Sequence, residues 1–136
     1  MTGVQTCALP ILAAVNAGLG WILSNTGAAT SITGSALADT ITGGTFDDTL
    51  RGSSGNDNIT GGLGNDTFVV DNASDSVSEA SAEGTDLVQS SITFTLADED
   101  IENLTLTGIT AIDGTGNTGN NEKFGIILNE AVAGVG

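Results

Sequence analysis

A large apolar residue recurs at every ninth position through the middle of the chain. Residues 34–69 divide into four nonapeptides: GSALADTIT, GGTFDDTLR, GSSGNDNIT and GGLGNDTFV. The eighth position of each unit is apolar, namely Ile41, Leu50, Ile59 and Phe68. Because a unit this short cannot enclose its one apolar side chain alone, neighbouring units must stack to form a core. The pattern therefore predicts a coil of short parallel strands, each with one inward-facing residue.

The spacing extends beyond these units in both directions. Leu23 and Ile32 precede Ile41 at nine-residue intervals, and Val77 follows Phe68. The upstream unit NTGAATSIT has Thr30 at its sixth position and is predicted to be a degenerate rung without a full metal site. Alternation of apolar and polar residues then predicts strands at 87–90, 92–96 and 101–107, and a further rung at 126–128.

Glycine and aspartate are as regular as the apolar residues. Position one is always Gly and position six is always Asp: Gly34, Gly43, Gly52 and Gly61, with Asp39, Asp48, Asp57 and Asp66. The Gly-rich half of each unit favours tight turns with positive φ. If a coil takes two units, each turn lies about 4.8 Å from the turn two units along. This stacking predicts that Asp39 lies near Asp57 and that Asp48 lies near Asp66.

Stacked carboxylates repel one another unless a cation lies between them. A cage of carboxylate and carbonyl oxygens suits calcium better than magnesium or zinc. The repeats are therefore predicted to bind Ca²⁺. The alternative is a series of ordinary turns rich in Gly, Asp and Asn that bind no metal.

The units resemble the RTX (hemolysin-type) calcium-binding repeats, whose consensus is GGxGxDxUx. GGLGNDTFV matches this consensus throughout, and GSSGNDNIT lacks only the second Gly. The first two units depart from the consensus, with Leu37 and Phe46 in place of the fourth-position Gly. The resemblance implies an all-β chain that forms a right-handed parallel β-roll and continues into irregular β rungs.

The resemblance also implies a set of calcium ligands. In the family, one turn supplies the carbonyls of positions two and four and its Asp. The turn two units later supplies the carbonyls of positions one and three and its Asp. One edge of the roll would then use Gly44, Phe46 and Asp48 with Gly61, Leu63 and Asp66. The other edge would use Ser35, Leu37 and Asp39 with Gly52, Ser54 and Asp57.

One more unit, VDNASDSVS, keeps the spacing but lacks the leading Gly residues. Its Asp75 either closes a third calcium site with Asp57 or is a solvated acidic turn residue. Asp71, Asp75 and Glu79 do not form an EF-hand, because the Gly of its sharp turn is missing.

The chain has seventeen acidic residues and only two basic ones, Arg51 and Lys123, which gives a formal net charge of −15. This charge argues against nucleic acid or an anionic membrane as a partner, and it predicts that the chain compacts only when cations relieve its self-repulsion. With no His or Tyr, the chain holds no Ser–His–Asp triad and no His-ligated zinc. Paired carboxylates could serve a glycosidase, but calcium explains every periodic Asp better. The chain is predicted not to be an enzyme.

Four regions follow from these patterns. Residues 1–11 (MTGVQTCALPI) resemble the in-frame translation of a sequencing adapter, although the apolar stretch from about Ala8 to Leu23 also suggests a signal peptide. No Lys or Arg precedes that stretch, and it is too short and Gly-rich for a membrane span. Residues 12–33 are predicted to be a cap, with Trp21 buried, and the degenerate rung. The β-roll repeats span 34–78, and a post-repeat strand region with a truncated end spans 79–136.

Three functions are compatible with this organisation. The first is a structural module of a secreted, extracellular bacterial protein that folds on binding calcium after export, with the type I secretion machinery as a partner. The second is the non-catalytic C-terminal part of a secreted protease, lipase or polysaccharide-modifying enzyme. The third is an adhesin or ice-binding surface built from outward-facing threonines. These are Thr40, Thr49 and Thr67 at position seven and Thr33, Thr42 and Thr60 at position nine. The pattern specifies no oligomeric state.

Overall fold

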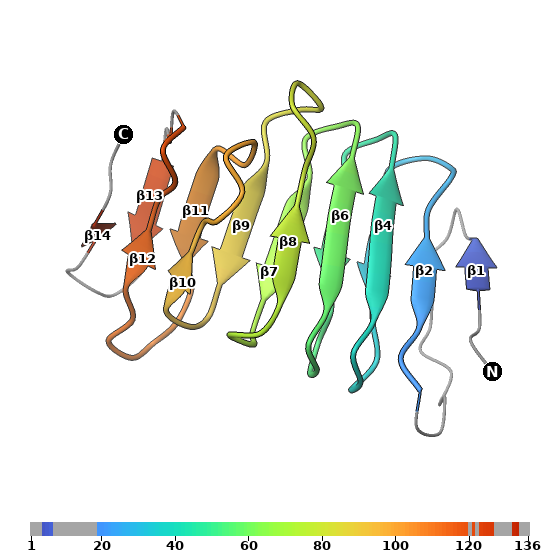
Figure 1. Ribbon diagram of the computed structural model, residues 1–136, viewed down its shortest axis with the longest axis horizontal. Helices are drawn as coiled ribbons and strands as arrows, with labels where there is room; N and C mark the ends of the chain where they lie inside the picture. Colours follow the sequence, from blue (N-terminus) through green and yellow to red (C-terminus); the bar gives the residue numbers. More distant parts are fainter. Residues whose placement is uncertain (1–3, 7–18, 120, 122, 127–131, 134–136) are drawn as a thin grey trace.

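The computed structural model describes residues 4–6, 19–119, 121, 123–126 and 132–133. These residues form short β-strands joined by turns and contain no helix (Figure 1). It follows that no described helix could span a membrane. The strands are β1 (Val4–Thr6), β2 (Ile22–Ser24), β3 (Ser31–Thr33), β4 (Thr40–Gly44), β5 (Thr49–Arg51), β6 (Asn58–Gly62), β7 (Thr67–Val70), β8 (Ser76–Ser78), β9 (Leu87–Ser90), β10 (Phe94–Thr95), β11 (Asn103–Leu106), β12 (Gly114–Thr115), β13 (Lys123–Ile126) and β14 (Val132–Ala133).

From β2 onward, successive strands alternate between the two faces of the roll, which are built from three parallel sheets (Figure 1). The front sheet has the order β1-β2-β4-β6-β8, and the three strands β10-β12-β14 continue on the same side. The back sheet has the order β13-β11-β9-β7-β5-β3. Every pairing is parallel, so the predicted all-β parallel roll is confirmed.

In the repeats, each residue pairs with the residue two units along. Ile41 pairs with Ile59 in the front sheet, and Leu50 pairs with Phe68 in the back sheet. One coil therefore consumes two nonapeptides, as predicted. Beyond β7 the number of residues between stacked turns changes. It is 18 in the repeats, then 20 from Asp66 to Asp86 and 16 from Asp86 to Glu102.

The core is a column of apolar side chains between the two sheets. Ile41, Leu50, Ile59 and Phe68 are all 0 % exposed. Leu23, Ile32 and Trp21 extend the column toward the N-terminal end, and Val88 and Leu104 extend it in the other direction. Because successive side chains of a strand point to opposite faces, a strand of about three residues needs only one apolar side chain to contribute to the core.

Within residues 19–33 the chain forms the strands β2 and β3, and residues 12–18 of the predicted cap lie outside the described residues. Trp21 is buried at this end of the column, as predicted. β1 lies within residues 1–11 and pairs with β2, Val4 opposite Ile22. The origin of residues 1–11 stays a prediction.

The predicted strand at 87–90 is confirmed, but the next two are shorter than predicted. β10 covers only Phe94–Thr95 of 92–96, and β11 covers Asn103–Leu106 of 101–107. The late start of β10 has a local cause, since Ser90 Oγ donates to the carbonyl of Ile92 and accepts from its amide, which turns the chain. Of the predicted rung at 126–128, only Ile126 is described, at the end of β13.

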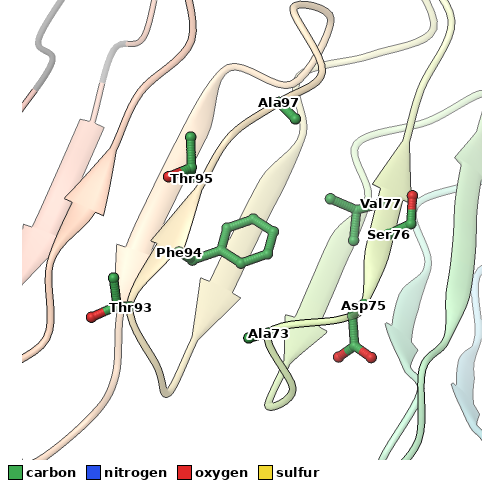
Figure 2. A pocket seen from close by; sticks show the side chains of 8 residues that line it. All are labelled: Ala73, Asp75, Ser76, Val77, Thr93, Phe94, Thr95 and Ala97. Carbon is green, nitrogen blue, oxygen red and sulfur yellow. The ribbon is translucent and has the colours of Figure 1, made fainter.

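The front side is interrupted between β8 and β10, which are not hydrogen-bonded neighbours. A cavity of about 300 Å³ lies at this interruption, and the Phe94 ring projects toward it from β10 (Figure 2). Val77 on β8 borders the cavity and is only half-buried, although it holds the apolar position of its unit. The regular part of the front sheet therefore ends at β8.

Candidate metal centre

The position-six aspartates form two rows, one along each edge of the roll. On one edge the Asp39 amide donates to Asp57 Oδ1 at 2.8 Å, and the Asp57 amide donates to Asp75 Oδ1 at 3.1 Å. On the other edge the Asp48 amide donates to Asp66 Oδ1 at 2.7 Å. The structure thus brings together both predicted pairs. In each pair, the carboxylate accepts a hydrogen bond from the turn two units earlier on the same edge.

The rows continue into turns that do not match the consensus. Thr30, at the sixth position of the degenerate rung, donates its amide to Asp48 Oδ1 at 2.8 Å. Beyond the repeats, the Asp66 amide donates to Asp86 Oδ1 at 2.7 Å, and the Asp86 amide donates to Glu102 Oε2 at 2.8 Å. Sequence reasoning missed Asp86 and Glu102. A signal for Asp86 was available, since it immediately precedes a strand, as each position-six Asp does.

The second oxygen of three aspartates has no hydrogen-bond partner among the described residues. Oδ2 of Asp48, Asp57 and Asp66 is buried, and these side chains are only 1–2 % exposed. Leaving a charged oxygen buried without a partner is costly. A cation bound beside these atoms would remove that cost.

The position-one glycines keep open the space that these oxygens face. A Cβ on Gly43 would lie 2.5 Å from the carbonyl oxygen of Gly61 and 3.0 Å from Asp48 Oδ2. On the other edge, a Cβ on Gly34 would lie 2.6 Å from the carbonyl oxygen of Gly52 and would clash with Asp39 Oδ2. Each space is thus bounded by a carboxylate oxygen and by the position-one carbonyl two units along. This all-oxygen donor set fits a hard cation such as Ca²⁺.

The remaining predicted carbonyls lie in the stacked turns. The Gly44 carbonyl accepts from the Leu63 amide at 2.9 Å. The carbonyl oxygens of Leu37 and Phe46 lie against Gly55 and Gly64, where an added Cβ would approach them to 2.6 and 2.8 Å. The side chains of Phe46 and Leu63 are 50 % exposed and carry no donor atom, so only their backbone carbonyls could serve as ligands.

Backbone conformation separates the first two turns from the last two. The fourth-position residues Gly55 and Gly64 have φ of 134° and 128°, whereas Leu37 and Phe46 do not adopt positive φ. The difference has a steric cause, because an L side chain is disfavoured in that region. Ser53, which replaces the second Gly of its unit, has φ of 71°.

Asp39 and Asp75 differ from the aspartates between them. Ser35 donates its amide to Asp39 Oδ2 at 2.5 Å, and its hydroxyl lies 3.0 Å from Oδ1. Asp75 Oδ2 accepts from the Asn72 amide at 3.2 Å. Asp75 is 9 % exposed and continues the row, so the solvated interpretation is wrong for this residue. Its role as a calcium ligand with Asp57 stays a prediction.

Burial and mutual repulsion disfavour the charged form of these carboxylates. Burial, together with smaller contributions from neighbouring aspartates, raises the pKa of Asp57 and Asp66 to about 6 against the lowering effect of backbone amides. Burial also raises the pKa of Asp48 and of Asp75. A divalent cation would reverse this balance by favouring the charged form.

The threonines proposed for an adhesive surface form only short ranks. Thr42 pairs with Thr60, and Thr49 pairs with Thr67. Thr40 instead lies opposite Asn58, and Thr33 lies opposite Arg51. Only two pairs of these threonines are therefore stacked, and no longer rank forms among them.

Comparison with known families matches residues 33–68 to the RTX calcium-binding nonapeptide repeat, in four copies. This segment begins one residue before the units defined above and contains both aspartate pairs. No curated protein and no solved structure matches the chain. Residues 33–68, about a quarter of the chain, are thus RTX calcium-binding nonapeptide repeats, and they form the most regular part of the β-roll.

Proposed function

We propose that this chain is a structural module of a secreted bacterial protein that folds when it binds calcium outside the cell. The observation that carries the proposal is a set of three buried aspartate oxygens, on Asp48, Asp57 and Asp66, that have no hydrogen-bond partner among the described residues. Each belongs to a carboxylate whose other oxygen is already held by a backbone amide. The carboxylates are therefore oriented by the fold, and a bound cation would compensate their remaining oxygens.

Calcium would act as the counter-charge that the sequence itself lacks. The chain has two basic residues against seventeen acidic ones. Metal binding that requires the folded turns contributes its binding free energy to folding. Each site would stabilise the fold by about 2.7 kcal/mol when free calcium exceeds the dissociation constant a hundredfold.

Secretion follows from the same coupling. Low cytosolic calcium would leave an acidic chain unfolded and suited to export through a narrow channel, such as the type I secretion machinery. Extracellular calcium sites typically bind in the range of about 10⁻⁴–10⁻³ M, so calcium outside the cell would then drive folding. The test is export of a chain whose position-six Asp residues are replaced by Asn. Unchanged export of a variant that no longer folds would contradict the secretory role.

The proposed role is not catalytic. The periodic aspartates are engaged by backbone amides and by the turn geometry, which supports a structural use of their carboxylates. If the chain is part of a secreted enzyme, the reaction would belong to another region of that protein. A catalytic motif in a longer version of the sequence, such as HExxH, would support that arrangement.

The primary test is a calcium titration of the full chain followed by far-UV circular dichroism, with magnesium as the control ion. We expect a cooperative transition to β structure at roughly millimolar calcium. Asp57→Asn should weaken it, because Asn keeps the acceptor for the Asp39 amide but removes the charge. Asp47→Asn is the matched control, since Asp47 is exposed and accepts an equivalent bond from the Asn65 amide. A chain that is folded in chelator and indifferent to calcium would overturn the proposal.

A further inference from the structure

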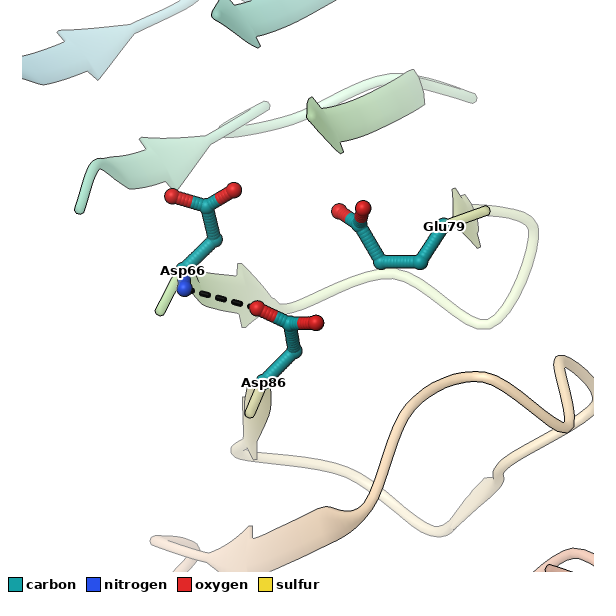
Figure 3. Close-up of side chains that lie close together, drawn as sticks. All are labelled: Asp66, Glu79 and Asp86. Atoms are coloured by element: carbon teal, nitrogen blue, oxygen red, sulfur yellow. Dashed lines mark hydrogen bonds between the residues drawn. The ribbon is translucent and has the colours of Figure 1, made fainter. Parts of the chain in front are cut away.

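Three carboxylates meet at one edge of the roll just beyond the last consensus repeat. Asp66 precedes β7, Glu79 follows β8 and Asp86 precedes β9. One oxygen of each lies within 4.8 Å of the others, and Figure 3 shows the carboxylates of Asp66 and Glu79 turned toward each other. Glu79 and Asp86 lie outside the matched repeats.

Two of these carboxylates present a buried oxygen that no described residue contacts by a hydrogen bond. Asp66 is 1 % exposed, and its Oδ2 has no partner. Glu79 Oε1 is also buried without a partner. A Cβ on Gly61 would clash with both atoms, so the two oxygens face the same small space beside Gly61.

The other oxygens of the cluster are held in place by backbone amides. Asp66 Oδ1 accepts from the Asp48 amide at 2.7 Å, and Asp86 Oδ1 accepts from the Asp66 amide at 2.7 Å. Glu79 Oε2 accepts from the Gly62 amide at 3.2 Å. These bonds orient the carboxylates and leave Asp66 Oδ2 and Glu79 Oε1 for another ligand.

Glu79 stands in for a group that the repeats supply from the backbone. Within the repeats, the space beside Gly43 is bounded by Asp48 Oδ2 and by the carbonyl of Gly61, which lies 18 residues along. Beside Gly61 the corresponding atoms are Asp66 Oδ2 and Oε1 of Glu79, again 18 residues along. Glu79 thus holds the position-one place of its unit, and its carboxylate oxygen lies beside Gly61 as the Gly61 carbonyl oxygen lies beside Gly43.

We propose that Asp66, Glu79 and Asp86 bind a calcium ion that closes this row of sites where the nonapeptides end. The inference rests on the proposed function for the identity of the ion, while the geometry of the three carboxylates supplies the site. An oxygen-only donor set without His or Cys favours a hard cation. Three carboxylates carry more charge than the two of each repeat pair, and affinity for calcium rises with ligand charge. This site is therefore expected to fill first.

The site would also fix the change of interval after the repeats. The turns that carry Asp66 and Asp86 lie 20 residues apart instead of 18. A shared ion would join the last consensus turn to this longer rung and hold β9 in register with β7.

The experiment compares Glu79→Gln with Glu99→Gln by calorimetric calcium titration of the full chain. Glu99 is exposed and its Oε1 accepts from the Thr118 hydroxyl, so its substitution controls for the change from Glu to Gln outside the three carboxylates. Glu79→Gln should lose one bound calcium per chain, from the tightest class, whereas Glu99→Gln should match the unsubstituted chain. Gln keeps the length and shape of the Glu79 side chain but cannot carry its negative charge. Circular dichroism at saturating calcium checks that the variant folds.

Asp57→Asn, on the opposite edge, separates this inference from the proposed function. If Asp57→Asn weakens binding and Glu79→Gln binds like Glu99→Gln, the terminal site is refuted while the repeats still bind calcium. If the unsubstituted chain binds no calcium, both proposals fail. Retention of the tight class by Asp57→Asn, with its loss in Glu79→Gln, supports both.

Discussion

At the scale of single residues, the two carboxylate oxygens of Asp48, Asp57 and Asp66 have different surroundings. Oδ1 of Asp57 accepts a hydrogen bond from the Asp39 amide and links successive coils, whereas its Oδ2 has no hydrogen-bond partner among the described residues. Asparagine could accept the same hydrogen bond but carries no charge. This division explains why a carboxylate, and not merely a turn-forming residue, is needed at the position.

Ser53 gives a prediction at the same scale. It adopts φ of 71° at a position where Gly44 and Gly62 also have positive φ. Because a left-handed conformation costs an L-residue about 1–2 kcal/mol, Ser53→Gly should stabilise the calcium-loaded chain by about 1 kcal/mol after the entropy of the unfolded glycine is counted. Urea unfolding in saturating calcium measures the change. Ser54→Gly, at a position without positive φ, should give no gain, and an equal gain there would contradict the explanation.

At the scale of elements, the strands β4, β5 and β6 are each held by one large buried side chain and by pairing on both sides. Ile59 on β6 lies between β4 and β8, and it is 0 % exposed. Val77 on β8 occupies the same position of its unit but borders the interruption of the front sheet. Identical places in the repeat therefore differ in packing.

This difference predicts unequal costs of truncation. Ile59→Ala should destabilise the calcium-loaded chain by about 2–5 kcal/mol, because it leaves a cavity in a closed core. Val77→Ala should cost clearly less, since Val77 is half-buried beside an existing cavity. Urea midpoints at saturating calcium compare the two variants. Equal losses would mean that the interruption at β8 does not persist in solution.

At the scale of the whole molecule, acidic groups accumulate inside the roll without compensating cations in the sequence. Burial raises the pKa of Asp57, Asp66 and Asp86 to about 6 and that of Glu79 to about 8. Asp86 and Asp66 face Glu79 and raise its pKa further, while the amides of Gly62 and Gly61 lower it. The metal-free fold therefore retains protons that the unfolded chain releases.

The sign of the resulting pH dependence is opposite to that of a salt-bridged carboxylate. Between the unfolded values of 3.8 and 4.5 and the folded values of about 6 and 8, the folded chain binds more protons. The stability of the metal-free chain should accordingly fall as pH rises from about 4 to about 8. Circular dichroism in chelator at a series of pH values measures this loss. Saturating calcium should remove it, and a metal-free fold that gains stability with rising pH would contradict these protonation states.

The sequence alone determined the period and, with it, much of the architecture. Ile41 and Ile59 occupy equivalent positions two units apart, and so do Asp48 and Asp66. The assumption that two units make one coil was therefore enough to pair them. Because each unit stacks on another unit of the same pattern, the residues of one unit were sufficient to predict its neighbours. The strands, the core column and the aspartate pairs could all be predicted for this reason.

Only the tertiary structure decided what happens where the repetition stops. Nothing in the spacing indicated that the turn of Asp86 stacks on that of Asp66, because the loop between them is two residues longer than a coil of repeats. Glu79 comes from a unit without the consensus glycines, and its side chain reaches Gly61 only because the coil brings the two together. Once the units differ, contacts depend on the length and path of each loop, and only the folded chain specifies these.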